Sequence, residues 1–182
     1  MSSKYKVNDD AIPHFITCTT IGWIDVFSRE EYKRMVVDSL SFCQLHKGLD
    51  IHAWVIMTNH LHLIVSSQTN SIPFIIRDFK KYTSKQIVQC IANNPIESRK
   101  EWMLNLFAYA GRNNNNNKDI QFWRQDYHPI ALDDVDKYNQ RLRYLHDNPV
   151  RSGLVWEPAD YKYSSAIDYY RAEKGLLPIM ML

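Results

Sequence analysis

The segment MTNHLHLIV, residues 57–65, decides how the centre of this chain folds. It places two histidines, His60 and His62, one residue apart in an apolar run. Successive side chains of a β-strand point to opposite faces, so both imidazoles share one face while the neighbouring leucines face a core. At a rise of roughly 3.3 Å per residue, the two histidines lie about 7 Å apart along the strand. Such a pair can converge on one divalent ion, or it can make only local hydrogen bonds.

Four strands are predicted from runs of β-branched and aromatic residues. They lie within residues 14–22, 50–57, 60–67 and 120–132. The dipeptide Thr58-Asn59 separates the second strand from the third, which favours an antiparallel hairpin. The two histidines therefore belong to the returning strand of that hairpin.

Helices are predicted between these strands from apolar periodicity and from start and stop residues. They cover residues 28–48, 72–92, 97–109 and 133–149. Ser28 with Glu31 forms a capping box at the start of the first helix, and Gly48 can end it. One of two successive aspartates, 133 or 134, caps the last helix, and Pro149 is expected to stop it.

This order of elements predicts an α+β fold in a single domain that spans residues 1–182. The expected architecture is a ferredoxin-like split β-α-β sandwich, an antiparallel sheet with helices packed on it and a C-terminal helix that carries Tyr144. A generic α+β domain is the alternative. The segment GRNNNNNKD, residues 111–119, is expected to be a flexible loop because asparagines build no core.

Composition excludes several classes of protein. Hydrophobic residues make up 45% and charged residues 23% of the chain, which is typical of a globular protein. No apolar run approaches 18 residues and the N-terminus carries no apolar signal region, so we expect a cytoplasmic protein without a membrane span. The three cysteines, Cys18, Cys43 and Cys90, form no CxxC pair, which argues against a disulfide framework and a cysteine-zinc site.

The helix pattern around RLRYLHDNPVRSG, residues 141–153, sets one tyrosine apart. At 100° per residue, an apolar stripe is predicted at Val135, Tyr138, Leu142 and Leu145. Tyr144 lies roughly 180° from Val135, and Asn148 is one turn further along the same side. Tyr144 is then either available for chemistry or simply an exposed tyrosine. A second tyrosine, Tyr82, is predicted to pack at the edge of its own helix stripe.

Together these motifs resemble those of the single-tyrosine HUH transposases, which move insertion sequences as single-stranded DNA. Residues 57–65 resemble the histidine–hydrophobic–histidine motif of that family. RYLHDNPVRSGLV, residues 143–155, is similar to the tyrosine helix of its REP-associated branch. FWRQDYH (122–128) and YKYSSA (161–166) also look like segments of that branch, and the resemblance extends over residues 14–170.

The resemblance implies a reaction and a set of residues. His60 and His62 would be two ligands of a divalent metal, Mg²⁺ or Mn²⁺, and Asn148 would occupy the position of the third protein ligand. Tyr144 would attack a scissile phosphate beside a DNA hairpin, which leaves a 5′-phosphotyrosine and a free 3′-hydroxyl. The partner would be single-stranded DNA with a hairpin, such as a REP-like repeat, and both a homodimer and a monomer remain open.

Basic residues gather around this expected chemistry. The predicted DNA-binding residues are Arg77, Lys80, Lys81 and Lys85, which fall within nine residues, together with Arg124 and Arg151. Candidates for stacking on unpaired bases are Trp123, Tyr127 and Trp156. Basic side chains beside aromatic rings are typical of single-stranded nucleic-acid binding, although solvated helix faces and core aromatics give the same pattern.

Three alternatives stay open at the level of sequence. A domesticated protein could bind hairpin DNA without cutting it. A metal-dependent nuclease could use water as its nucleophile, in which case Tyr144→Phe would remain active. A histidine-containing structural domain would bind no metal at all.

Overall fold

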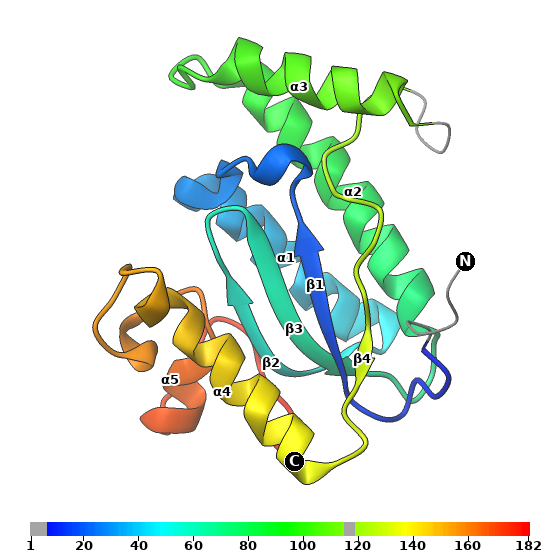
Figure 1. Ribbon diagram of the computed structural model, residues 1–182, viewed down its shortest axis with the longest axis vertical. Coiled ribbons are helices and arrows are strands. Elements are labelled where there is room, and N and C mark those ends of the chain that lie inside the picture. Colours follow the sequence, from blue (N-terminus) through cyan, green and yellow to red (C-terminus); the bar gives the residue numbers. More distant parts are fainter. Residues whose placement is uncertain (1–6, 115–118) are drawn as a thin grey trace.

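The computed structural model of the protein describes residues 7–114 and 119–182, and its centre is a four-stranded antiparallel sheet (Figure 1). The strands are β1 (His14–Thr19), β2 (Asp50–Ile56), β3 (His60–Ser66) and β4 (Ile130–Ala131). Their spatial order is β2-β3-β1-β4, so β3 inserts antiparallel between β1 and β2. This is the split β-α-β arrangement, and the predicted ferredoxin-like α+β fold is confirmed.

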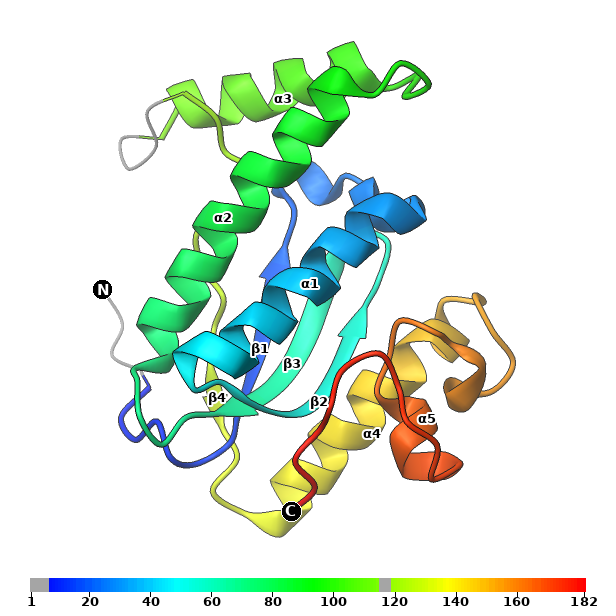
Figure 2. The same cartoon turned by 180° about the vertical axis from the view of Figure 1, so that it is seen from behind.

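Helices cover both faces of the sheet. They are α1 (Glu30–Lys47), α2 (Ile72–Asn93), α3 (Lys100–Arg112), α4 (Val135–Arg151) and α5 (Ala166–Tyr170). Helices α1 and α2 lie on one face, and α4 lies across β2 and β3 on the other (Figures 1 and 2). Helix α3 caps one end of the sheet. In the described part of the chain, no helix is both long enough and apolar enough to cross a membrane.

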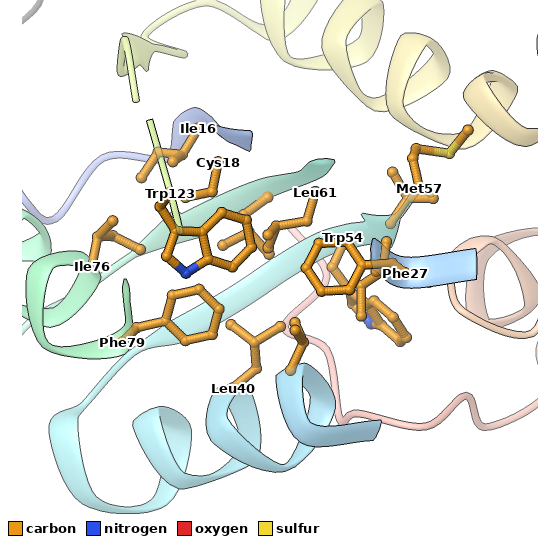
Figure 3. Close-up of a cluster of buried hydrophobic side chains, with 14 of the residues drawn as sticks. Ile16, Cys18, Phe27, Leu40, Trp54, Met57, Leu61, Ile76, Phe79 and Trp123 are labelled. Atoms are coloured by element: carbon orange, nitrogen blue, oxygen red, sulfur yellow. The ribbon is translucent and has the colours of Figure 1, made fainter. Parts of the chain in front are cut away.

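The larger core lies between the sheet and helices α1 and α2 (Figure 3). Its fully or almost fully buried side chains include Ile16, Cys18, Leu40, Leu61, Ile76, Phe79 and Trp123. Burying one such large side chain stabilises the fold by roughly 1.5–3 kcal/mol. Trp123 is tied down further, because its Nε1 donates to the Thr83 hydroxyl at 3.0 Å. Trp123 is therefore a core residue and not a surface for stacking bases.

The opposite face of the sheet meets α4 and contains the two histidines. The pairing of β1 with β3 sets Thr17 opposite His62 and Thr19 opposite His60. Residues opposite each other in an antiparallel pair lie on the same face, so the threonines and histidines share the side that α4 covers. The hairpin turn at residues 58–59 falls where it was predicted and brings His60 to the end of β3.

Helix α1 ends as predicted but starts differently. Gly48 closes it in the left-handed conformation, with φ 68°. The predicted capping box is wrong, because Arg29 occupies the N-cap position and Ser28 lies in the preceding 3₁₀ turn. The Ser28 hydroxyl instead accepts a hydrogen bond from Arg99 at 3.3 Å. The local sequence pattern predicted that Ser28 caps the helix, but in the structure its side chain binds Arg99, which is distant in sequence.

Two further helices depart from the predicted boundaries. Helix α3 begins three residues after the predicted start at Glu97, because that buried carboxylate pairs with Arg29 at 2.5 Å and Arg99 at 3.2 Å. Helix α4 runs through Pro149 to Arg151. A proline removes only its own N–H, and the next backbone amides still bond to carbonyls of the last turn, so the predicted stop is wrong.

The packed face of α4 also differs from the predicted stripe. Val135 is 74% exposed, because the first turn of α4 extends beyond the ends of the strands (Figures 1 and 2). The buried residues are Leu145, His146 and Pro149. His146 packs against Ser165 and Tyr169 of the C-terminal segment, so α4 is covered on two sides. Its buried face is wider than a single-sided amphipathic stripe.

The connection from α3 to α4 is mostly irregular. The strand predicted within residues 120–132 is reduced to β4, and a separate bridge joins Trp123 to Thr20. The asparagine-rich segment 111–119 begins inside the last turn of α3. Residues 115–118, four of the nine residues of the predicted loop, lie outside the described residues.

Candidate active site

The two histidines of β3 converge. Their ring centroids are 4.7 Å apart with an interplanar angle of 72°, closer than their spacing along the strand. His62 is buried at 4% exposure, and His60 is half-buried at the strand end. The sheet therefore presents two imidazoles as one compact pair beside α4.

Hydrogen bonds orient each imidazole through the same ring atom. His62 Nδ1 lies 2.8 Å from the Thr17 hydroxyl, and His60 Nδ1 lies 2.6 Å from Asn59 Oδ1. An amide oxygen only accepts, so His60 carries its proton on Nδ1. Although His62 Nε2 is buried, it has no hydrogen-bond partner among the described residues. Nδ1 held by a neighbour and Nε2 left open is the arrangement of metal-ligating histidines.

Burial keeps both imidazoles neutral. It lowers the pKa of His60 to about 4. It lowers the pKa of His62 to about 3, and electrostatic interactions with His60 and Arg141 act in the same direction. Neutral imidazole is the form that binds a metal ion, so the pair suits a divalent cation at neutral pH.

Tyr144 of α4 packs directly on this pair. Its ring centroid lies 5.4 Å from that of His62 and 6.0 Å from that of Phe15. The Arg151 guanidinium lies over the tyrosine ring at 5.7 Å. Tyr144 is therefore not on the side of α4 away from the sheet, as the helical count predicted, but at the edge of the face that meets β3.

Asn148 joins the site through Tyr144. One turn along α4, its Nδ2 donates to the Tyr144 backbone carbonyl at 2.6 Å. This bond uses the amide nitrogen and not the oxygen that would coordinate a metal. Across residues 7–114 and 119–182, no three histidine, cysteine, aspartate or glutamate side chains form a metal-binding group. Among those residues, a metal at the histidine pair would need a ligand of another type, such as an amide oxygen.

The predicted DNA-binding residues fall in two places. A groove of about 550 Å³ runs between α2 and residues 120–127. Four of the six predicted residues line it: Arg77, Lys80, Lys81 and Arg124. Lys85 is exposed one turn further along α2, and Arg151 lies apart on α4 beside Tyr144.

The basic residues of the groove are not equally available. Lys80 Nζ donates to the carbonyls of Arg124 and Gln125 at 2.6 and 3.0 Å, so it ties the 120–127 segment to α2. Burial lowers the Lys80 pKa, with partial compensation from nearby acidic groups. Arg77 pairs with Asp78 at 3.0 Å. Lys81 and Arg124 are exposed and face the groove.

The exposure of several aromatic side chains differs from what the sequence predicted. Trp156 is 95% exposed in the loop after α4, and Tyr127 is half-buried beside Lys80. Tyr82, which was predicted to pack, is 58% exposed. Of Tyr82 and Tyr144, it is Tyr144 whose ring contacts a histidine, His62.

Three residues near the site escaped the sequence analysis. Thr17 and Asn59 hold the histidine rings, and Trp23 lies edge-on to His60 at 6.1 Å between ring centroids. Thr17 could have been found by pairing the predicted strands in register. No local pattern marks Trp23, because it comes from a short 3₁₀ turn after β1.

Comparisons with known proteins bear on the family and the fold of this chain. A family model described as "Transposase IS200 like" matches residues 9–110, more than half of the chain. A solved REP-associated tyrosine transposase bound to a REP hairpin superposes with a TM-score of 0.67 at 16% identity, covering 99% of this chain and 92% of that one. A candidate transposase from Deinococcus radiodurans has a TM-score of 0.47 at 13% identity, covering 81% and 95%. No curated protein sequence matches the chain.

Proposed function

Because this chain belongs to the IS200-like transposase family, we propose that it cuts and rejoins single-stranded DNA with Tyr144 as its nucleophile. The observation that carries the proposal is the packing of the Tyr144 ring on His62, whose Nε2 is buried and open. A nucleophile beside a pair of neutral imidazoles suits metal-assisted phosphoryl transfer.

The reaction balances without a cofactor that is consumed. Tyr144 Oη attacks the scissile phosphorus in line and loses its proton, the bond from phosphorus to the 3′-oxygen breaks, and that oxygen takes up a proton. The products are a 5′-phosphotyrosine and a free 3′-hydroxyl. Attack by a 3′-hydroxyl on the phosphotyrosine reverses these steps and joins strands. The phosphotyrosine bond conserves the energy of the broken bond, so no nucleotide is needed.

We propose that His60 and His62 hold a divalent cation, Mg²⁺ or Mn²⁺, through their Nε2 atoms. The Asn148 side-chain oxygen is the proposed third ligand, since its hydrogen bond to Tyr144 uses the amide nitrogen. When bound, such an ion supplies Lewis acidity and orientation for the scissile phosphate. Thr17 and Asn59 keep the two imidazoles in the tautomer that ligates.

The proposed substrate is single-stranded DNA that carries a hairpin. The similar solved transposase is bound to a REP hairpin, and this chain has the same fold over nearly its whole length. Lys81, Lys85 and Arg124 are exposed cations for phosphates, and Arg151 adds one beside the tyrosine. We propose that residues 1–182 form one domain, within which Tyr144 packs on His62.

Covalent trapping tests the proposal. Labelled single-stranded oligonucleotides tiled across the DNA that flanks the gene are incubated with the protein and Mn²⁺ or Mg²⁺, then run on denaturing gels. We expect a metal-dependent protein–DNA adduct that Tyr144→Phe abolishes. Tyr82→Phe is the matched control, because Tyr82 is exposed on α2 and should leave the adduct unchanged.

Other outcomes would overturn the proposal. Cleavage without an adduct that persists in Tyr144→Phe would indicate a nuclease that uses water. Hairpin binding without any cleavage would indicate a DNA-binding protein that has lost the reaction. Loss of the adduct in Tyr82→Phe but not in Tyr144→Phe would assign the nucleophile to the other tyrosine.

A further inference from the structure

Trp23 is an exposed aromatic residue held in a strained turn next to the histidine pair. Its side chain is 56% exposed, and its φ of 55° lies in the left-handed region, directly after Gly22 at 62°. A bulky residue rarely adopts this conformation, and such strain persists only where the surrounding structure enforces it. Apolar burial does not explain the position of this ring.

The turn that carries Trp23 is joined to the candidate active site. Asn59 Nδ2 donates to the Trp23 carbonyl at 3.3 Å, while Asn59 Oδ1 accepts from His60 at 2.6 Å. The Trp23 amide donates to the Thr20 carbonyl at 3.2 Å. One asparagine therefore links the backbone of the tryptophan turn to the His60 ring.

A cation completes the surface around the indole ring. The Arg124 guanidinium lies over the Trp23 ring at 5.7 Å, and the ring stands edge-on to His60. Arg124 itself is exposed and anchored by its backbone amide, which donates to the Thr19 carbonyl at 2.8 Å. An exposed aromatic ring beside a cation is the combination that holds an unpaired base and its phosphate.

Tyr144 and Trp23 lie on different sides of the histidine pair, which suggests how a DNA strand would run across the site. Tyr144 packs on His62, whereas Trp23 packs on His60, so the tyrosine and the tryptophan flank the histidine pair from different rings. In-line displacement requires the attacking and leaving oxygens to lie on opposite sides of phosphorus. With Tyr144 attacking from the His62 side, the departing 3′-oxygen lies towards His60 and Trp23.

We propose that Trp23 stacks on the base immediately 5′ of the scissile phosphate, with Arg124 binding the adjoining backbone phosphate. This inference rests on the proposed function, because it takes its direction from attack by Tyr144. The Trp23 subsite would hold the strand that leaves with the free 3′-hydroxyl. Retaining that strand keeps the 3′-hydroxyl close to the phosphotyrosine for rejoining.

A binding measurement tests the stacking without requiring cleavage. Fluorescence anisotropy gives the Kd of labelled (dT)15 for wild type, Trp23→Ala, Trp23→Phe and Trp102→Ala. Trp102 on α3 is the matched control, since its 52% exposure is close to that of Trp23. We expect Trp23→Ala to weaken binding about 5- to 150-fold, the range for loss of one stacked base, and Trp23→Phe to restore most of it. Equal Kd values for wild type and Trp23→Ala, or no measurable binding by either, would overturn the stacking site.

A second measurement tests the direction. In the oligonucleotide that forms the adduct, a single abasic nucleotide is placed either 5′ or 3′ of the scissile phosphate, and Tyr144→Phe protein is used to prevent cleavage. The 5′ abasic nucleotide should weaken binding only while Trp23 is present, so its effect should vanish in Trp23→Ala. A Trp23-dependent effect at the 3′ position would overturn the assignment. If no oligonucleotide forms an adduct but Trp23→Ala still weakens (dT)15 binding, the proposed function fails and the stacking site stands.

Discussion

Replacing Thr17 by valine should weaken metal binding, although Thr17 is not one of the proposed metal ligands. The Thr17 hydroxyl is the hydrogen-bond partner of His62 Nδ1, at 2.8 Å on the neighbouring strand. The imidazole is neutral because burial lowers its pKa to about 3, so it carries one proton on one of its two nitrogens. With the proton on Nδ1 facing Thr17, Nε2 is the free ligand.

The size of the effect follows from the cost of the wrong tautomer. Thr17→Val keeps the shape but removes the acceptor, and a buried donor without a partner costs about 1–3 kcal/mol. Because Nε2 is also buried without a partner, the proton is then no longer held on Nδ1, and an imidazole that carries it on Nε2 cannot coordinate a metal. At 1.4 kcal/mol per factor of ten, the Kd for a divalent cation should rise about 10- to 100-fold, the usual range when a ligating histidine loses its outer partner.

Calorimetric titration with Mn²⁺ measures this change directly. The Mn²⁺ concentration that gives half-maximal adduct should rise by the same factor, while the adduct yield at saturating Mn²⁺ stays close to that of wild type. Thr17→Ser is the matched control, because it retains the hydroxyl and should bind Mn²⁺ like wild type. A Thr17→Val protein that binds Mn²⁺ within twofold of wild type would refute the assignment of His62 Nε2 as a ligand.

Burial lowers the pKa of His146 to about 4, so between pH 6.5 and 4 the unfolded chain binds a proton that the folded chain does not. His146 alone should therefore lower the free energy of unfolding by about 2 kcal/mol from pH 7 to pH 5, in addition to similar contributions from His60 and His62. In urea titrations the fall in His146→Gln should be smaller than in wild type by that amount, and an equal fall would contradict this cause. Glu97→Ala leaves two arginines without their shared buried carboxylate and should cost about 2–3 kcal/mol, read as a lower urea midpoint; an unchanged midpoint would show that the pairs contribute nothing. Gly48→Ala and Gly153→Ala both place a side chain at a φ near 70°, but only at Gly48 would the new Cβ collide with Thr69. The Gly48 variant should be the less stable in thermal melts, and equal melting temperatures would exclude the collision.

Much of the fold was predictable because it depends on local patterns. Alternation along residues 60–66 identified β3 and the face that its histidines share, and the short dipeptide before His60 predicted the hairpin. The predicted helix starts were wrong where a side chain expected to act within the helix instead binds a residue distant in sequence. Ser28 binds Arg99 and does not cap α1. Glu97 pairs with Arg29 and Arg99 and lies outside α3.

The candidate site was only partly predictable for a related reason. Helical spacing correctly put Tyr144 and Asn148 one turn apart, but it assigned Tyr144 to the wrong side of α4. That error came from treating Val135 as buried, whereas α4 is covered both by the sheet and by the segment containing Tyr169. A single sequence carries no signal for how many sides of a helix are packed.

The sequence by itself determined the chemistry that this protein carries: two histidines on one strand face, and a tyrosine with an asparagine one helical turn later. Those relations span few residues, so the periods of strand and helix are sufficient to establish them. Only the tertiary structure decided that Tyr144 meets His62, that Thr17 and Asn59 orient the imidazoles, and that Trp23 stands beside His60. Each of those contacts joins separate elements, and their positions depend on the packing of the whole sheet against its helices.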